Sequence, residues 1–331
     1  MEKDIQLELF RVVKSKIPEH VSAADEIAKI LAISADSAYR RMRGEKPVTL
    51  DEASKLCSHF NISVDQLLNI QNNAFLFFGK CLNPQNFNFN EYLANVQEYM
   101  MFMQNFKSKE IIYLCKDIPL FHHYHFKDLA AFKYYFWMKT LLHFPGFANK
   151  KFSLDDYPAT TFELGQKTLN LYSQLDVYEL WNFESLNSTL RQIEFYHDSD
   201  LFVTSEEAFR VYTALEMFMD HLEKQAETGF MFNVDDTSMK QTGKFKMYFN
   251  ELVTLDNSIL AQLDGTRIAF QVHNICNFMM TRDLTFCNHT YENMQMLMRK
   301  STLISSVSER ERLRFFNRLR NKVHARKETI R

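Results

Sequence analysis

Four cationic side chains lie close together near the start of the chain: Arg40, Arg41, Arg43 and Lys46, with Glu45 as the acidic residue among them. Guanidinium groups bind phosphate oxygens, and a guanidinium can also pair with guanine through two hydrogen bonds. Each phosphate that such a cluster neutralises adds salt-sensitive affinity for nucleic acid. The cluster therefore predicts contact with nucleic acid. The alternative is that these side chains are a solvated helix face.

The residues around the cluster predict two short helices joined by a tight turn, over residues 24–44. Ile27, Ile30 and Leu31 have the spacing of one apolar helix face. Ser34 suits the N-cap of the second helix, because its hydroxyl can accept a hydrogen bond from a free backbone N–H. That helix is expected over 35–43, and Gly44 is expected to end it in a left-handed conformation. The pattern is that of a helix-turn-helix.

The first 70 residues resemble the phage-repressor/Cro-type helix-turn-helix domain, also called the xenobiotic-response-element class. The matching positions are Ala28, Ser34, Gly44, Pro47, Ile62, Ser63, Asp65 and Leu67. Two positions depart from the family: Ala32 stands where the turn often has Gly, and Ala24 where a Gln often contacts phosphate. The run SAYRRMRGE resembles one-component regulators common in Bacteroidetes, and a weaker resemblance extends to the KDIPLF and KSTLIS stretches. The resemblance implies a compact five-helix bundle that binds DNA. Thr49 and Glu52 fit a capping box for a helix from Leu50 to about His59, and the last short helix is expected over 64–70.

The helix-turn-helix geometry assigns each residue of the second helix an expected role. The N-terminal part of this helix faces base edges in the major groove. The candidates for base contact are Ala35, Asp36, Ser37 and Arg40. The candidates for phosphate contact, which positions the helix without reading sequence, are Ser34, Tyr39, Arg41, Arg43 and Lys46.

Composition favours helices and a protein inside the cell. The chain has 331 residues with 7 Gly and 6 Pro, far below the usual shares of about 7% and 5%, which argues against a turn-rich all-β fold. No apolar run approaches the roughly 18 residues of a membrane span, and the first residues lack a signal-peptide pattern. The five cysteines are odd in number and form no C-x-x-C pair, as in reduced cytosolic proteins. We therefore expect a cytoplasmic location and no membrane contact.

The pattern of elements predicts a mainly α protein with two domains. We expect a helix-turn-helix DNA-binding domain at 1–70, a linker at 71–73, and a larger, mostly helical domain at 74–331 that dimerises and is a candidate sensor. In that domain 109–115 favours a strand and 120–142 one long buried helix. The runs between about 246 and 281, with Asp264-Gly265 as a hairpin turn, predict a small antiparallel sheet of three or four strands.

Three histidines, His122, His123 and His125, lie in one segment of the second domain. His122 and His125 could share a helix face and bind one metal ion, with His143 or Asp128 as a third ligand. The alternative is that the rings pack among aromatic side chains with their nitrogens satisfied. No HExxH or comparable spacing supports a metal, so we expect no metal and no cofactor.

Two further stretches carry groups that bind anions. The stretch KSTLIS and the serine after it could hold an anion between two helices through Lys300, Ser301, Thr302, Ser305 and Ser306. The alternative is helix capping, by Ser306 with Glu309 or by Ser308 with Glu311. Residues 299–331 carry 11 Lys and Arg against 3 Asp and Glu, whereas residues 71–298 carry 18 against 27. The basic face of the last helix comprises Arg310, Arg312, Arg314, Arg318, Arg320 and Lys322.

That basic face has three interpretations: contact with DNA, pairing with the acidic middle of the same or a partner chain, or a solvated surface.

The aromatic segment 120–142 has two interpretations. Its rings could line a pocket for an apolar or flat ligand, or they could form part of the core. The rings concerned are Phe132, Tyr134, Tyr135, Phe136 and Trp137.

Together these features predict a sequence-specific transcriptional regulator that binds double-stranded DNA as a homodimer and is not an enzyme. Its effector, a small molecule or a protein, is not indicated by the sequence. One alternative is an adaptor or antitoxin-like protein-interaction module whose DNA binding is only autoregulatory. Another is a metal-dependent hydrolase built on the histidines, for which no nucleophile–base pair or phosphate loop is present.

Overall fold

The computed structural model describes residues 5–17, 21–60, 62–64, 67, 75–79, 87–234, 242–252, 256–274 and 276–330. The chain divides into two compact units, Met1–Leu76 and Phe77–Arg331. The domain boundaries expected from the sequence stay a prediction, and the linker expected at 71–73 lies outside the described residues.

The first unit is a small helical bundle. Its helices are α1 (Ile5–Lys14), α2 (Ala23–Leu31), α3 (Ala35–Met42) and α4 (Leu50–Phe60). They surround a core of buried apolar side chains, which comprises Leu9, Phe10, Val13, Ala24, Ile27, Ala28, Leu31, Ala38, Met42, Leu56 and Cys57. Of the fifth helix expected at 64–70, residues 64 and 67 are described and the rest lie outside the described residues.

The second unit is built on one mixed sheet, which has seven strands in the part of the chain that the structure describes. The strands are β1 (Lys109–Cys115), β2 (Asp176–Trp181), β3 (Phe245–Phe249), β4 (Ser258–Leu263), β5 (Thr266–Asn274), β6 (Asn277–Thr281) and β7 (Thr302–Leu303). Their order across the sheet is β6-β5-β4-β1-β2-β3-β7. β1, β2 and β3 are parallel, and the other pairings are antiparallel.

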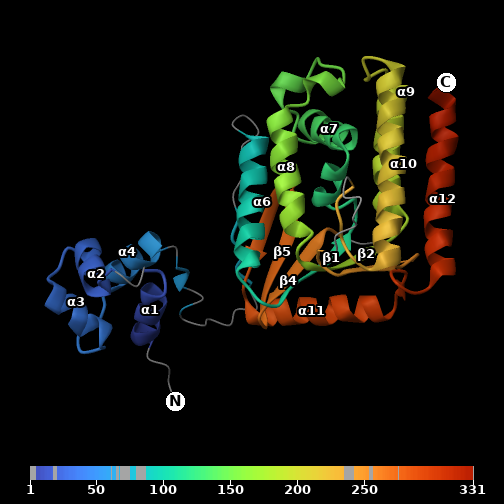
Figure 1. The fold of residues 1–331 in the computed structure, drawn as a ribbon. Coiled ribbons are helices and arrows are strands. Elements are labelled where there is room, and N and C mark those ends of the chain that lie inside the picture. Colours follow the sequence, from blue (N-terminus) through green and yellow to red (C-terminus); the bar gives the residue numbers. More distant parts are fainter. Residues whose placement is uncertain are drawn as a thin grey trace. The chain divides into compact units, whose positions relative to one another are not determined.

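Helices cover both faces of this sheet (Figure 1). They are α6 (Phe89–Gln104), α7 (Lys127–Phe136), α8 (Ala159–Tyr172), α9 (Glu184–Asp198), α10 (Ser205–Thr228), α11 (Leu284–Arg299) and α12 (Glu309–Lys327). Alternate residues of β1 face opposite sides: Ile111 and Tyr113 belong to the large core under the helix layer, and Ile112 packs in the smaller core with α11.

The expected fold class is therefore wrong. The chain is 59% helical with about 15% in strands, and its sheet is a mixed seven-stranded one rather than a small antiparallel one. The antiparallel hairpins β4–β5–β6 exist, with Asp264 and Gly265 at the turn between β4 and β5. However, β4 also pairs antiparallel with β1, which is parallel to β2, so the hairpins are part of the larger sheet. The strand β2 was not expected from the sequence. The chain is an α/β protein and not a mainly α or all-α one.

The helix expected over 120–142 is also interrupted. Residues Leu120–His125 form a 3₁₀ helix, Phe126 is extended with φ −131° and ψ 119°, and α7 begins only at Lys127. The chain then continues from Phe136 into a short π-helical turn, Trp137–Leu141. The extended residue separates the histidines from the aromatic residues of α7, so these two groups do not share one continuous helix.

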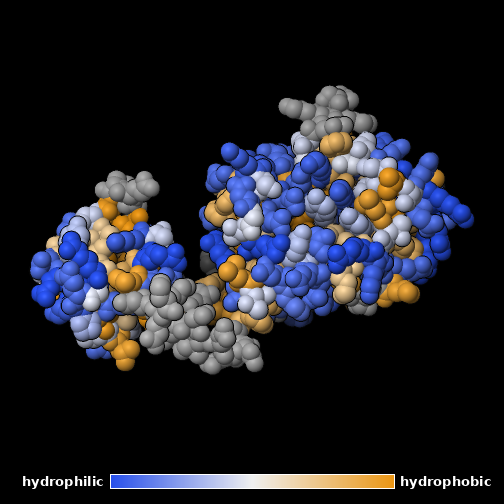
Figure 2. All heavy atoms as spheres, turned by 90° about the horizontal axis from the view of Figure 1, so that it is seen from below, coloured by the Kyte–Doolittle hydropathy of each residue, from blue (hydrophilic) through white to orange (hydrophobic). Residues whose placement is uncertain are grey.

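In the described residues, no helix combines the length and the apolar character that crossing a bilayer requires. The face drawn in Figure 2 is largely hydrophilic, with apolar residues in scattered patches. Exposed apolar side chains include Leu50, Leu252 and Leu284.

We predict that Gly165→Ala destabilises the second unit. Gly165 lies in α8 where the helix crosses the buried ring of Tyr124, and a Cβ at this position would overlap that ring. Overpacking of this kind costs about 1–3 kcal/mol of unfolding free energy. Gly146→Ala is the matched control, because its Cβ would meet the Phe144 ring at 3.6 Å, an ordinary contact. Denaturant unfolding of both variants measures the difference, and equal stability would contradict the close packing of α8.

Candidate nucleic-acid interface

A tight left-handed turn sets the angle between α2 and α3. Ala32 has φ +55°, and its backbone N–H bonds the carbonyls at the end of α2. Ser34 then caps α3, with its Oγ accepting from the backbone N–H of Ser37 at 3.2 Å. At the other end Gly44 has φ +78°, the left-handed conformation expected of it. The alanine at the turn therefore adopts the conformation that glycine often supplies in similar domains.

The helix α3 presents one face to the core and the other to solvent. Ala38 and Met42 are buried in the core of the first unit. Of the residues predicted to contact DNA, Ala35 and Ser37 are half-buried at the edge of the buried face. The exposed ones are Ser34, Asp36, Tyr39, Arg40, Arg43 and Lys46. Asp36, Tyr39, Arg40 and Arg43 thus form the outward face of the helix.

Arg41 does not belong to that outward face. Its side chain is 6% exposed, and its guanidinium binds both carboxylate oxygens of Glu52 at 3.0 and 2.7 Å. It also donates to the carbonyl of Ser37. A guanidinium held in this way reaches a phosphate only if the ion pair opens. Arg41 therefore fastens α3 to α4, and we leave it out of the proposed interface.

Glu52 binds both Arg41 of α3 and Thr49 at the start of α4. Its backbone N–H bonds Thr49 Oγ1, and its carboxylate accepts from the Thr49 backbone N–H at 3.1 Å, which confirms the capping box at the start of α4. The same carboxylate binds Arg41, whose hydrogen bond lowers the pKa of Glu52 below its ordinary value of 4.5. The capping box was visible in the sequence. The ion pair was not, because it joins two helices across 11 positions.

The loop after α3 is held by a side chain from α1. Gln6 donates to the carbonyls of Arg41 and Lys46, both at 2.7 Å, and accepts from the backbone N–H of Val48 at 3.0 Å. No local signal in the sequence indicates this role, because the partners lie 35 to 42 positions away. Gln6 and Glu52 are therefore positioning residues for the basic helix.

The exposed cations of α3 are only loosely paired. Arg40 and Arg43 lie 3.9 and 3.6 Å from the carboxylate of Glu45, and all three side chains are about half-exposed or more. Ion pairs of this kind contribute about 0–1 kcal/mol, so they can be exchanged for phosphates at little cost. The Arg43 guanidinium also lies 5.9 Å from the ring centre of Tyr39.

Residues 11–85 match the BetR domain family. This match identifies a helix-turn-helix-like DNA-binding domain, and it covers 75 of the 331 residues. No curated protein and no solved structure matches the chain. The family match fits a DNA-binding regulator, and it includes α2, α3 and α4.

The three clustered histidines of the second unit are hydrogen-bonded only in part, because His122 Nδ1, His123 Nε2 and His125 Nε2 are buried without a hydrogen-bond partner in the described structure. His122 Nε2 lies 2.8 Å from a carboxylate oxygen of Glu179, and both side chains are fully buried. Asp128 instead binds Arg210, at 3.0 Å from Nε, and His143 is exposed. Among the described residues no group of three or more His, Cys, Asp or Glu is arranged to hold a metal ion. The geometry gives the metal-dependent hydrolase no support.

The basic residues of α12 pair with acids of the same chain. Arg320 binds Asp220 at 2.8 Å and also Glu223, while Lys327 binds Glu216 at 2.5 Å, all three acids on α10. Arg318 binds Glu251 at 3.0 Å, and Arg312 is buried against backbone carbonyls. Of the three interpretations of this helix, pairing with the acidic middle of the same chain has the direct support of these contacts.

The KSTLIS stretch makes internal hydrogen bonds. Ser301 Oγ donates to Leu297 O at 2.6 Å, and Ser305 Oγ accepts from the backbone N–H of Met247 at 3.0 Å. Ser308 precedes α12 but makes no capping hydrogen bond with its side chain.

The aromatic segment 120–142 contributes to the core of the second unit. Phe132, Tyr135 and Phe136 are buried there.

We predict that Arg41→Met destabilises the first unit by about 1–3 kcal/mol, because it leaves a largely buried carboxylate without its charged partner. Arg40→Met, at the neighbouring exposed position, is the control and should change stability by less than about 0.5 kcal/mol. Thermal or urea unfolding measures both. Since the folded pKa of Glu52 is lowered, the contribution of the pair is present at neutral pH and is lost as pH falls below 4.5. Equal losses for the two variants would refute the role of Arg41.

We also predict that acid destabilises the second unit through its buried histidines. Burial lowers the pKa of His123 to about 3 and that of His221 to about 4, from an ordinary value of 6.5. The unfolded chain therefore binds more protons between pH 4 and 6.5, so stability falls as pH falls through this window, by about 1.4 kcal/mol per pH unit for each histidine. His221→Gln should remove one such contribution, measured as the slope of unfolding free energy against pH.

The control is His289→Gln, which changes an exposed histidine of α11 and should leave that slope as it is. A His221→Gln variant with the parental slope would show that this histidine does not titrate as its burial implies.

Proposed function

We propose that the chain is a sequence-specific transcriptional regulator of the phage-repressor/Cro-type class, in which α3 enters the major groove of double-stranded DNA. The observation that carries this proposal is the division of α3 into two faces. Its apolar residues and Arg41 are used to pack the helix, and Asp36, Tyr39, Arg40 and Arg43 are directed outward. The match to the BetR domain supports the same interpretation.

Within this proposal the residues of α3 divide into two roles. Ala35, Asp36, Ser37 and Arg40 contact base edges, with Arg40 suited to guanine and Asp36 to the amino group of cytosine. Ser34, Tyr39, Arg43 and Lys46 contact phosphates. Ser34 can do so while it caps the helix, because its oxygen accepts from Ser37 and its own hydroxyl hydrogen is available.

The proposal includes a homodimer formed by the second unit. Residues 1–70 hold 10 Lys and Arg against 11 Asp and Glu, so one copy binds the polyanion only through its local cations. Two copies on a near-palindromic site, with recognition helices about 34 Å apart, act at high effective concentration. The proposal assigns the chain no catalytic role.

We predict distinct effects for two substitutions on α3, measured by binding to DNA from the protein's own promoter region across a salt series. Arg40→Ala should lose about 1–3 kcal/mol of discrimination between the preferred fragment and others, because it removes a base contact. Arg43→Ala should weaken binding to every fragment and lower the slope of log K against log salt by about 1, because it removes a phosphate contact.

Lys14→Ala removes the same charge from the end of α1 and is the control for general electrostatics. Binding that is equally weak on all fragments and unaffected by both α3 substitutions would exclude α3 as the recognition helix. Stable co-purification with one protein at fixed stoichiometry, together with that result, would favour the adaptor instead.

A further inference from the structure

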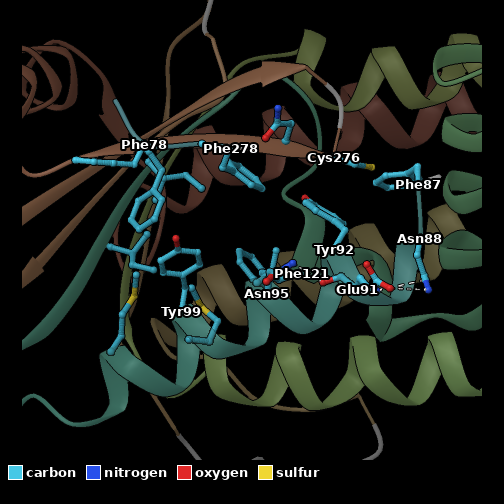
Figure 3. A pocket seen from close by; sticks show the side chains of 18 residues that line it. Phe78, Phe87, Asn88, Glu91, Tyr92, Asn95, Tyr99, Phe121, Cys276 and Phe278 are labelled. Atoms are coloured by element: carbon cyan, nitrogen blue, oxygen red, sulfur yellow. Dashed lines mark hydrogen bonds between the residues drawn. The ribbon is translucent and has the colours of Figure 1, made fainter. Parts of the chain in front are cut away.

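A cavity of about 560 Å³ lies between α6 and the sheet, lined by residues of β1, β4, β5 and β6 (Figure 3). Pockets for small ligands are typically about 300–1,000 Å³ and mostly apolar, with a few placed polar groups. This cavity has the size of such a site, and nothing in the proposed DNA-binding role uses it.

Seven of its 18 described lining residues are aromatic. Tyr92 and Tyr99 extend from α6, and Phe278 lies opposite on β6 (Figure 3). The rings of Tyr92 and Phe278 are nearly parallel, with an interplanar angle of 9° and centroids 6.2 Å apart. These rings present flat apolar surfaces, which suit a ligand that itself contains aromatic rings.

Some of this apolar surface is still exposed to water. The side chain of Phe78 is 42% exposed and that of Tyr99 is 41% exposed, although both line the cavity. A ligand in the cavity would cover these rings and remove their apolar surface from water. This burial of apolar area would stabilise the complex.

Three polar lining residues follow one another from the N-cap into the first half of α6, and a fourth, Asn277, lies on β6. Asn88, Glu91 and Asn95 are spaced one helical turn apart, and Asn88 lies 3.4 Å from the Glu91 carboxylate (Figure 3). Among the described lining residues, Glu91 is the only one with a carboxylate, and none is Lys or Arg. A ligand with a negative group would meet this carboxylate without a counter-charge.

We propose that this cavity binds a neutral or cationic small molecule with aromatic rings, which places its rings against Tyr92, Tyr99 and Phe278 and a hydrogen-bond donor near Glu91. We further propose that this ligand regulates DNA binding. This second step rests on the proposed function, whereas the binding step does not.

The regulatory step rests on residues 77–79, of which Phe78 and Gly79 line the cavity. Phe78 pairs with Met280 of the edge strand β6 through two backbone hydrogen bonds, of 2.7 and 2.8 Å. Its neighbour Phe77 packs edge-on against Phe286 of α11, with ring centroids 5.0 Å apart. Phe77 follows directly on Leu76, the last residue of the first unit. A ligand that contacts Phe78 therefore acts on the point where the chain from the DNA-binding unit joins the sheet.

The first experiment measures binding of a neutral fluorescent probe, N-phenyl-naphthylamine, to the full chain. Its sulfonated analogue, anilinonaphthalene sulfonate, has the same rings with a negative charge. We expect one neutral probe per chain and at least fivefold weaker binding of the sulfonate. Val96→Phe should weaken probe binding at least tenfold, because Val96 is buried at the cavity wall.

Met101→Phe is the matched control on the same helix, because Met101 is 48% exposed and is not among the lining residues. It should leave probe affinity within twofold. Circular dichroism and melting of both variants check that they fold, and Phe78→Ala is a second test that adds no bulk to the cavity and should also weaken probe binding. Equal binding of both probes, or binding unchanged in both Val96→Phe and Phe78→Ala, would overturn the site.

The second experiment measures affinity for promoter DNA with and without saturating probe. Coupled sites typically change each other's affinity about 5–150-fold, and the change is reciprocal. We expect at least a fivefold change for the parent and for Met101→Phe, and none for Val96→Phe. Normal probe binding with unchanged DNA affinity would overturn the regulatory step. If the chain binds no DNA at all, the proposed function fails, and the probe experiment still decides whether the cavity is a ligand site.

Discussion

A carboxylate lies in the middle of β2 without exposure to water, at Glu179. Burying such a group is costly unless donors surround it. Here three donors do so: His122 Nε2 at 2.8 Å, Tyr172 OH at 2.7 Å and Trp181 Nε1 at 2.9 Å. His122 belongs to the 3₁₀ helix after β1 and Tyr172 to the end of α8. The carboxylate therefore joins β2, the middle one of the three parallel strands, to the elements that connect β1 with β2.

Polar contacts also hold the first unit together, where α3 buries few apolar side chains. The helix α3 contributes Ala38 and Met42 to the core, which is little for eight residues. Polar contacts supply the rest: Arg41 to Glu52, and Gln6 to the loop that follows. Because these contacts fix the helix from its inner side and its end, the outward residues make no essential packing contacts. They are therefore available for a ligand.

Local chemistry made part of this structure predictable. The cap at Ser34, the capping box at Thr49 and the turn at Asp264 each depend on neighbours within a few positions. The strand β2 was missed because Glu179 interrupts its apolar pattern, and its partners are distant in the sequence. The burial of Arg41 was missed because its partner, Glu52, lies on another helix. The cavity was not foreseen either, because the apolar stripe of α6 has the same pattern whether it faces a packed core or a hollow.

The register of the segment before the cavity limits how a ligand could act through it. Phe77 faces α11 and Phe78 faces the cavity, as successive residues of an extended segment do. A shift by one residue would exchange the two rings between opposite sides of β6. Close contact adds to this restriction, because a Cβ on Gly79 would already lie 3.0 Å from the side chain of Met279. A gradual slide of the segment along β6 is therefore opposed by the register of its two rings. Under the regulatory proposal, the ligand would act by stabilising or releasing the pairing of Phe78 with β6, because coupling to a distant site requires an element with two arrangements.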